Sequence, residues 1–591
     1  MTSISRRQAI QIGLAASTLA FIPILRQRVA RGADQISAQL PPRYTFPFKF
    51  PPLASDPGVA TICKQGLPIA GSPFSTPYTA QNYTGGLVEP IGFTTRDVYQ
   101  IDIKRALVDI LGNGQKTQIW GYGGRTPGPT IKVQKGTEVL VRMRNSVDQP
   151  DVFGNTVYTS CHLHGMASLP PFDGWANDIT LPDEEKDYYY PNNRPATHWY
   201  HDHGVHRTAY NAYCGLAAMY IVEDPNEIPG LPKTYGVNDF PVMLGDKIFD
   251  ANGQLVFDET MVTNEGLHGD VILVNGVPWP TMTVEPKPYR FRMLSTGISR
   301  AYNYVLSNGG TMYVIGTDGG LLEKAVPVRS LRAGPAERYE VVIDFSQYAG
   351  QTFELRNAGL KNHPDYLHTN KIMQFKVKQS VSSGFLGRLA PNDKSVDPTA
   401  FRDSLNRCRR DAFNYSQRIA ALRAYGIQTT GSIPERTMVF ERKNGVWTIN
   451  GRTWENGVNS IEANPRSGGI EIWRLKNNSG GWNHPIHLHL VDFLLMSRTG
   501  GNSPGVKEYE KGFKDVTYLG ENEEITIITI FGPHDGKYMF HCHNLIHEDD
   551  DMMRAFNVGG NGIEPVGTDG TSGTRGQGPY DAKPIGTRPP L

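Results

Sequence analysis

The chain has 591 residues, and its 59 Lys and Arg residues nearly balance its 58 Asp and Glu residues. This balance excludes a field strong enough to recruit nucleic acid or an anionic membrane, so we expect a small-molecule partner. The length exceeds that of one ordinary domain, and the 63 glycines and 42 prolines are typical of turn-rich β structure rather than a helical bundle.

Residues 1–40 contain a candidate export signal. Arg6 and Arg7 precede a short apolar run diluted by Gln, Ser, Thr and Gly, which is typical of a twin-arginine signal. We therefore expect a folded protein exported to the periplasm or the extracellular space. An uncleaved anchor or an ordinary extension is the alternative, because no A-x-A cleavage site stands out. The run is too short and too polar to predict a stable membrane span.

Three β-rich blocks follow in chain order. Residues 41–228 and 229–378 alternate short β-rich stretches with Gly/Pro turns, as in β-sandwiches, and the second block has few candidate metal ligands, so we expect it to be architectural. Residues 379–434 have helical spacing and basic charge, which predicts a partly helical connection. Residues 435–560 form the third β block. The tail, 561–591, is rich in Gly, Pro and Thr, and we expect it to be disordered.

Four His-x-His pairs occur where chance would give about 0.4. They lie in "TSCHLHGM", "THWYHDHG", "HPIHLHLVDF" and "YMFHCHNL", and are His162/His164, His201/His203, His487/His489 and His541/His543. In a strand, residues i and i+2 point to the same face about 6.8 Å apart, so each pair presents two imidazoles to one side. A lone pair is more often a satisfied structural feature. Four pairs, two in each terminal block, exceed what one zinc ion takes, and they predict a cluster of several ions between the first and third domains.

The residue between the last two histidines must face the other way. Cys542 therefore serves a different metal, and His484, His547 and Met552 complete that second site. Two imidazoles, a thiolate and a weak thioether describe a blue-copper electron-transfer centre. The stretch from His541 to His543 then links the two sites covalently.

These motifs carry a family resemblance. The sequence resembles the multicopper oxidases, and among them the bilirubin oxidases and bacterial spore-coat laccases, through "TPGPTI", "HLHGMASLPPFDGWANDIT", "WYHDH", "YRFRMLS", "GPAERYEVVIDF", "GGWNHPIHLHLVDF" and "HCHNLIHEDDDMM". The resemblance covers all three β blocks. It implies an all-β fold of three consecutive cupredoxin-like Greek-key β-sandwich domains.

The resemblance also implies four copper ions. Type 1 copper would be bound by His484, Cys542 and His547, with Met552 axial; type 2 copper by His162 and His487; and the type 3 pair by His164, His201 and His543 on one ion and His203, His489 and His541 on the other. The other six histidines are expected to be structural or exposed: His198, His206, His268, His363, His368 and His534.

The implied activity is oxidation of bilirubin-like tetrapyrroles, phenols or aromatic amines, one electron at a time, coupled to reduction of O2 to water. Asp173 and Glu548 are the candidate proton-carrying acids, with Asp173 preferred; the alternative for Glu548 is a solvated turn or a hydrogen bond to a ligand imidazole. Trp482 lies either near the point of electron transfer or in a packing position.

Two other functions compete with this interpretation. One is a Cu(I) or Fe(II) oxidase in copper homeostasis, which a Met-rich insertion would favour, although none is visible among the 15 methionines. The other is a non-catalytic copper-binding surface protein, which needs no pair of linked sites. If Cys542 binds metal, the remaining cysteines, Cys63, Cys161, Cys214 and Cys408, allow three disulfide pairings, and the sequence does not choose among them or set the oligomeric state.

Overall fold

The computed structural model describes most of the chain beyond the expected export signal. The described residues are 35–57, 59–64, 95–257, 266–360, 363–409, 416–417, 419–420, 422–424, 433–454, 460–560 and 581–587, with backbone alone for 61–64, 95 and 96. The candidate signal around Arg6 and Arg7 thus lies outside them. Within these ranges, no helix has both the length and the apolar character needed to cross a bilayer.

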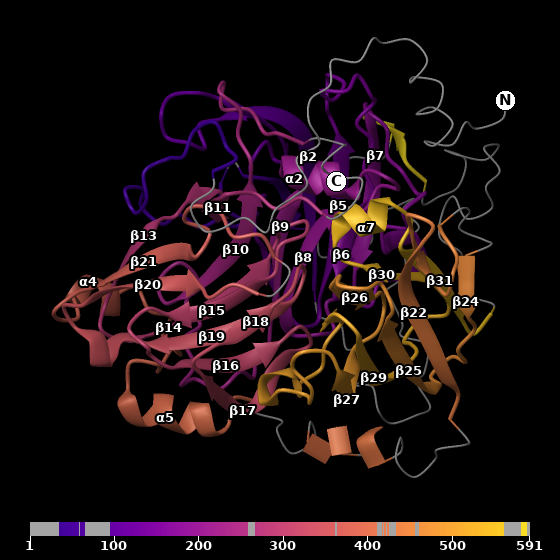
Figure 1. Cartoon of the computed structure of the whole chain (residues 1–591). Helices are drawn as coiled ribbons and strands as arrows, with labels where there is room; N and C mark the ends of the chain where they lie inside the picture. Colours follow the sequence, from indigo (N-terminus) through magenta and orange to yellow (C-terminus); the bar gives the residue numbers. More distant parts are fainter. Residues whose placement is uncertain are drawn as a thin grey trace.

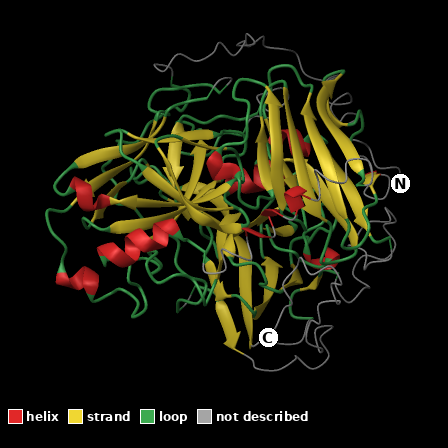
Figure 2. Cartoon of the chain, turned by 90° about the horizontal axis from the view of Figure 1, so that it is seen from below, coloured by secondary structure: helices red, strands yellow, loops and turns green. Residues whose placement is uncertain are grey.

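Strands dominate the structure, and they form three sandwiches of two sheets each (Figures 1 and 2). The prediction of an all-β chain of three consecutive sandwiches is therefore confirmed. In Figure 1 the second sandwich lies on the left and the third at the lower right, with the first above and behind them.

The sheets of the first sandwich, in strand order, are β1 (Thr61–Lys64), β2 (Thr95–Val108), β5 (Thr137–Asn145), β7 (Glu184–Tyr190) and β32 (Lys583–Pro584), with β3 (Thr117–Tyr122) on β2; and β4 (Ile131–Gln134), β9 (Ala217–Glu223), β8 (Ala196–Asp202) and β6 (Cys161–His164).

Those of the second are β12 (Val277–Pro278), β11 (Val271–Val274), β10 (Asp239–Lys247), β14 (Pro288–Ser295), β19 (Arg338–Asp344), β16 (Met312–Thr317) and β17 (Gly320–Val328); and β13 (Thr281–Val284), β21 (Lys371–Val377), β20 (Thr352–Asn357), β15 (Tyr302–Leu306) and β18 (Leu331–Ala333).

Those of the third are β23 (Val446–Ile449), β22 (Glu435–Lys443), β25 (Ile470–Asn477), β29 (Glu523–Ile530) and β27 (Phe493–Gly500); and β24 (Ile461–Ala463), β31 (Met553–Val558), β30 (Gly536–Cys542), β26 (His484–Leu488) and β28 (Val516–Leu519).

One pairing pattern recurs in all three sandwiches. In the first sheet of each sandwich, one strand pairs parallel with a second strand, which in turn pairs antiparallel with a third. These triplets are β2, β5 and β7; β10, β14 and β19; and β22, β25 and β29. In the second sheet, β4, β13 and β24 pair parallel with β9, β21 and β31. The three sandwiches are thus built on one plan, and each has its own apolar core.

The helices are short and lie at the ends of strands or in connections. They are α2 (Thr208–Cys214), α4 (Ser383–Leu386), α5 (Pro398–Asn406) and α7 (Leu545–Asp549), with 3-10 turns η1 (Pro170–Phe172), η2 (Phe345–Tyr348) and η4 (Glu508–Glu510). Helices α4 and α5 lie in the segment for which the sequence indicates helix, and the side chain of Asp397 caps α5 by accepting from the amides of Thr399 and Ala400.

The expectation of a disordered tail is wrong for residues 581–587. There β32 returns to the first sandwich and pairs antiparallel with β7, with Lys583 opposite Glu185. Asp581 and Ala582 are buried beside it. The pairing satisfies the edge of β7, which a composition rich in Gly and Pro does not reveal.

Candidate metal centre

The four histidine pairs lie on two facing sheets. In the first sandwich, β6 and β8 pair so that His162 stands opposite His201. In the third, β26 and β30 pair so that His487 stands opposite His541. Rings from the two sandwiches stack directly on one another: the ring centroids of His164 and His487 are 3.6 Å apart. The interface between the first and third sandwiches therefore contains a cluster of imidazoles.

Ring nitrogens converge in three groups within this cluster. In each group the candidate ligand atoms lie within 4.8 Å of one another; the groups are His162, His164 and His487; His164, His201 and His543; and His203, His489 and His541. All eight residues are buried. These are the eight residues of the four His-x-His pairs.

The spacing of these nitrogens fits a shared metal ion. His541 Nε2 lies 3.2 Å from the Nε2 atoms of both His203 and His489, and His487 Nε2 lies 3.4 Å from His162 Nε2. Nitrogens bonded at about 2.0 Å to one tetrahedral ion would be about 3.3 Å apart. At His489, Nδ1 donates to Asp173 Oδ2, so the lone pair lies on Nε2. A cation between such acceptor nitrogens would account for their close approach.

Unpartnered nitrogens give a second indication. His164 Nδ1, His201 Nε2 and both ring nitrogens of His543 are buried without a hydrogen-bond partner. These three residues form one of the converging groups. A buried polar atom without a partner is costly, and a bound cation would satisfy it. Burial lowers the pKa of each of these imidazoles, which keeps the lone pairs available.

Cys542 lies on the opposite face of β30, as strand alternation requires. Its Sγ is 3.3 Å from His484 Nδ1 and 3.6 Å from His547 Nδ1, and the two imidazole nitrogens are 3.2 Å apart. Met552 is buried in the same core, and its backbone carbonyl accepts a hydrogen bond from the Cys542 amide at 3.1 Å. Thiolate and imidazole ligands in a three-way arrangement suit copper.

Two tryptophans border this second site. Trp447, which we did not single out from the sequence, lies against His547 with ring centroids 3.9 Å apart. Trp482 is more distant, at 6.1 Å from His547, and is only partly buried. No local signal marks Trp447, because it lies 100 residues from His547 along the chain.

The two predicted acids both contact the histidine cluster. Asp173 follows η1; its Oδ2 accepts from His489 Nδ1 at 2.7 Å, and its carbonyl accepts from His162 Nδ1. Glu548 Oε2 lies 2.9 Å from His541 Nδ1, and Glu548 also lines a surface depression. Burial raises the pKa of Asp173 well above its usual range and that of Glu548 to about 7. Both are thus placed to hold a proton beside the cluster.

A third acid, Asp515, was missed by the sequence analysis. Its Oδ1 lies 3.0 Å from His164 Nε2, and its carbonyl accepts from His487 Nδ1 at 2.8 Å. Asp515 directly precedes β28, in the sequence "GFKDVTYL", and it is buried. An acidic residue beside an apolar strand is seldom buried without a partner, so this position could have been identified as a candidate from the sequence.

Among the side chains that the structure describes, the remaining histidines and cysteines take no part in the groups. The six other histidines belong to none of the converging groups within the described residues: His198, His206, His268, His363, His368 and His534. Cys161, Cys214 and Cys408 are buried free thiols, which excludes disulfides among them, and the side chain of Cys63 lies outside the described part of the chain.

Comparisons with known proteins agree with this geometry. Multicopper oxidase family models match residues 104–227, 229–379 and 429–561. A bilirubin oxidase from Albifimbria verrucaria is 42% identical over 477 residues, covering 78% of this chain and 76% of the relative, and a laccase from Bacillus subtilis is 32% identical over 510 residues, covering 78% and 94%. The crystal structure of the multicopper oxidase McoA from Aquifex aeolicus superposes with a TM-score of 0.64 at 26% identity, covering 80% of this chain and 99% of that one.

Proposed function

The chain belongs to the multicopper oxidase family and is a copper-binding oxidoreductase that uses oxygen, and from this premise we propose how its residues divide the reaction. Bilirubin-like tetrapyrroles, phenols or aromatic amines give up electrons one at a time beside Cys542, and O2 is reduced to water in the histidine cluster. The similarity to a bilirubin oxidase and to laccases supports this substrate class.

We assign four copper ions to the two sites. Type 1 copper would be held by His484, Cys542 and His547, with the buried Met552 as a weak further ligand; type 2 would be held by His162 and His487; and the type 3 pair would be held by His164, His201 and His543 on one ion and His203, His489 and His541 on the other. When bound, copper supplies one-electron redox chemistry at the first site and multi-electron reduction of O2 at the cluster.

The backbone of β30 connects the two sites. Cys542 directs its sulfur to one face of the strand, while its neighbours His541 and His543 direct imidazoles to the other, with ring centroids 5.5 Å apart. A carbonyl contact reinforces this link, because the Cys542 carbonyl accepts from His541 Nδ1 at 3.2 Å. A continuous covalent path, Cys542 side chain to backbone to neighbouring imidazole, therefore joins the sulfur to the cluster.

Protons for water formation are assigned to Asp173 and Glu548. Each carboxyl is buried against a cluster imidazole and has a raised pKa. Glu548 also lines the depression that contains His206 and Asp551, both partly exposed, so it can be reprotonated from solvent. Asp173 then serves the side of the cluster near His162 and His489.

The observation that carries the proposal is that consecutive residues at the end of β30 place Cys542 in a two-histidine site and its neighbours, His541 and His543, in a separate cluster of eight buried histidines. The test is copper stoichiometry with a visible spectrum, followed by oxygen uptake with bilirubin, a simple phenol and Fe(II). We expect about four coppers, an intense blue thiolate band and turnover of the two organic reductants. Cys542→Ser should abolish the blue band. Oxygen uptake with Fe(II) alone would instead favour the metal-ion oxidase.

We also propose that residues 1–40 direct export by the twin-arginine route to the periplasm or extracellular space. The support is the Arg6–Arg7 pair ahead of a weakly apolar run. Changing both arginines to lysine should retain the protein in the cytoplasm while leaving its copper sites intact. Equal export of the variant and the wild type would reject this route.

A further inference from the structure

A buried ion pair lies where the three sandwiches meet. Arg338, at the start of β19 in the second sandwich, holds both carboxylate oxygens of Asp515, with Nη1 and Nη2 each 2.5 Å from an oxygen. Both residues are buried. Bidentate pairing of this kind fixes the plane of the carboxylate as well as its position.

Asp515 connects this pair to the histidine cluster. Its Oδ1 lies 3.0 Å from Nε2 of His164, which belongs to the first sandwich, and its carbonyl accepts from Nδ1 of His487. A carboxylate held by Arg338 can only accept hydrogen bonds, so His164 must carry its proton on Nε2. The lone pair of His164 is then on Nδ1, which is the nitrogen left without a partner in the cluster.

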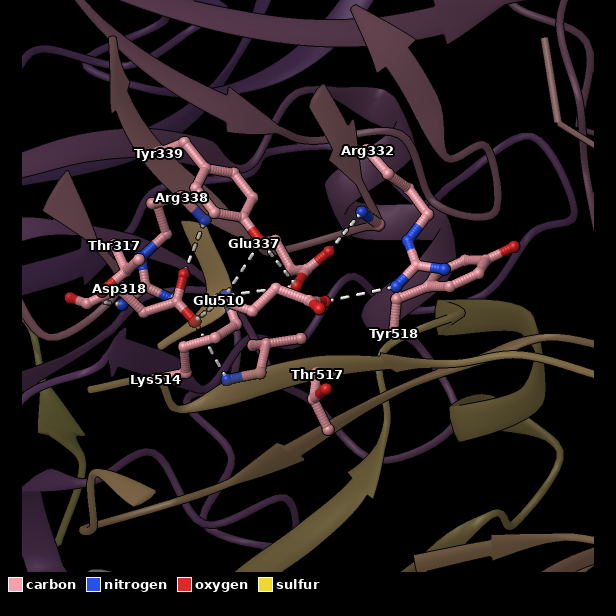
Figure 3. Close-up of polar contacts among 12 residues, drawn as sticks. Thr317, Asp318, Arg332, Glu337, Arg338, Tyr339, Glu510, Lys514, Thr517 and Tyr518 are labelled. Atoms are coloured by element: carbon pink, nitrogen blue, oxygen red, sulfur yellow. Dashed lines mark hydrogen bonds and ion pairs between the residues drawn. The ribbon is translucent and has the colours of Figure 1, made fainter. Parts of the chain in front are cut away.

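Arg338 is itself fixed by other charges. Its amide donates to Asp318 Oδ1 at 2.7 Å, and Asp318 Oδ2 lies 2.9 Å from Lys514 Nζ. Lys514 also pairs with Glu337 at 3.1 Å, and Figure 3 shows these side chains joined across the boundary between the second and third sandwiches. The network leaves Arg338 little freedom to leave its carboxylate.

The first sandwich closes the third side of this junction. Arg338 Nε donates to the Thr197 carbonyl on β8 at 3.0 Å. Gly165, directly after the first His-x-His pair, has φ +93°, and a Cβ there would lie 2.5 Å from Arg338 Nη2 and 2.8 Å from Asp515 Oδ2. A glycine is thus required for the ion pair to reach the cluster.

We propose that Arg338 is a positioning residue through which the second sandwich orients two imidazoles of the cluster, His164 by way of the Asp515 carboxylate and His487 by way of the Asp515 backbone. The inference rests on the proposed copper assignment of those histidines. It gives the second sandwich, which we expected to be architectural, a direct part in preparing the metal centre.

Weakening the Arg338–Asp515 pair should lower copper affinity in the histidine cluster and leave the Cys542 site unchanged. Partners that orient a ligand imidazole typically change metal affinity or activity by about 10- to 100-fold. Arg338→Lys keeps the positive charge but removes the bidentate grip, so the Asp515 carboxylate is free to rotate away from His164. We expect copper in the histidine cluster to bind about 10- to 100-fold more weakly, measured by titration against a competing chelator, with a weakened or altered type 2 electron paramagnetic resonance signal. In Arg338→Lys the blue absorption at Cys542 should be unchanged, because the neighbouring ligands of that site, His484 and His547, are not among the imidazoles that Asp515 contacts.

Arg292→Lys is the matched control. Arg292 lies on the neighbouring strand β14, is buried, and binds Asp239 through Nε at 2.9 Å and Nη2 at 2.8 Å. Its Nη1 donates to Thr197 Oγ1 and to Glu340, and among the described residues it contacts no histidine of the cluster. It therefore reports the cost of weakening a buried arginine–carboxylate pair in the same sandwich. Equal cluster affinity in the two variants would overturn the proposal, and so would equal loss of the blue site and the cluster in Arg338→Lys.

A second variant covers the case in which Arg338→Lys does not fold. Asp515→Asn introduces an amide that can donate as well as accept, so it no longer dictates the protonated nitrogen of His164, and we expect about tenfold weaker cluster binding. Unchanged cluster affinity in this variant would also overturn the proposal. Wild-type protein that takes copper only at Cys542 would refute the copper assignment itself, which separates that failure from failure of the role of Arg338.

Discussion

At the scale of single residues, the two oxygens of Asp173 have different surroundings. Oδ2 accepts from His489 Nδ1, whereas Oδ1 is buried without a hydrogen-bond partner and lies 3.8 Å from His162 Nδ1. Burial raises the pKa of this carboxyl. The side chain can therefore carry a proton on one oxygen while the other continues to orient His489.

Asp173→Asn should keep that orientation and remove the proton transfer. We expect reoxidation of the reduced enzyme by O2 to slow by about 100-fold or more, as is usual when a general acid is lost. Stopped-flow mixing with O2 measures this rate. Anaerobic reduction of the blue copper is the internal control and should be unchanged. Unchanged reoxidation would remove Asp173 from the proton role.

Met552 acts on the other site. Its carbonyl accepts from the Cys542 amide and its own amide donates to the His547 carbonyl at 2.9 Å, so its backbone is bound to two of the proposed type 1 ligands. A weak axial thioether lowers the potential of such a copper. Met552→Leu should therefore raise the potential, on the order of 60 mV, which is tenfold in a one-electron equilibrium. A redox titration that matches the wild type would exclude Met552 as a ligand.

The His-x-His spacing identified the histidines that converge in the structure, because residues i and i+2 of a strand point to the same face of the sheet. It did not identify Asp515 or Trp447. Both reach the metal centre through tertiary packing: Asp515 contacts His164 across 351 positions, and Trp447 lies against His547 from a strand far away in the sequence. Contacts of that kind leave no periodic trace in a single sequence.

At the scale of elements, the short strand β32 lies near the C-terminus but pairs with β7 of the first sandwich, which it can therefore stabilise. The Ile585 amide donates to the Asp183 carbonyl at 2.9 Å, and Lys583 pairs with Glu185 on β7. Ending the chain at residue 580 should remove two or three hydrogen bonds and some buried surface, worth about 2–3 kcal/mol. We expect the first sandwich to unfold roughly 5 °C lower in calorimetry. Ending the chain at residue 587 is the control, and equal transitions in both truncations would refute a stabilising role.

At the scale of the whole molecule, the metal centre depends on how the sandwiches assemble. The recurring strand plan places the histidine strands β6, β8, β26 and β30 on the second sheets of the first and third sandwiches. The sequence predicted that these two domains meet, since two pairs come from each. It did not predict that the second sandwich reaches the same place through Arg338, because nothing in a strand's alternation reveals which sheet packs against it.

This assembly has a consequence for the copper-free protein. Ten buried imidazoles are held neutral, since burial lowers the pKa of every one; the pKa of His203 and His541 falls to about 4 and that of His484 to about 3. Unfolded, each would titrate near 6.5. Below that pH the unfolded chain binds more protons than the folded one, so stability is lost as the pH falls.

The loss should be steep. Each such group contributes up to about 1.4 kcal/mol per pH unit below its unfolded pKa, so several together exceed the stability of an ordinary domain within one or two units. We expect the copper-free protein to keep its denaturant midpoint above about pH 6.5 and to lose it toward pH 5. The first and third sandwiches should separate first, because they share the cluster. Small-angle scattering at pH 7.5 and 5.5 would show this as a larger radius of gyration at the lower pH. A copper-free protein equally compact and stable at both values would mean that the imidazoles are solvated, and the buried cluster would then be wrong.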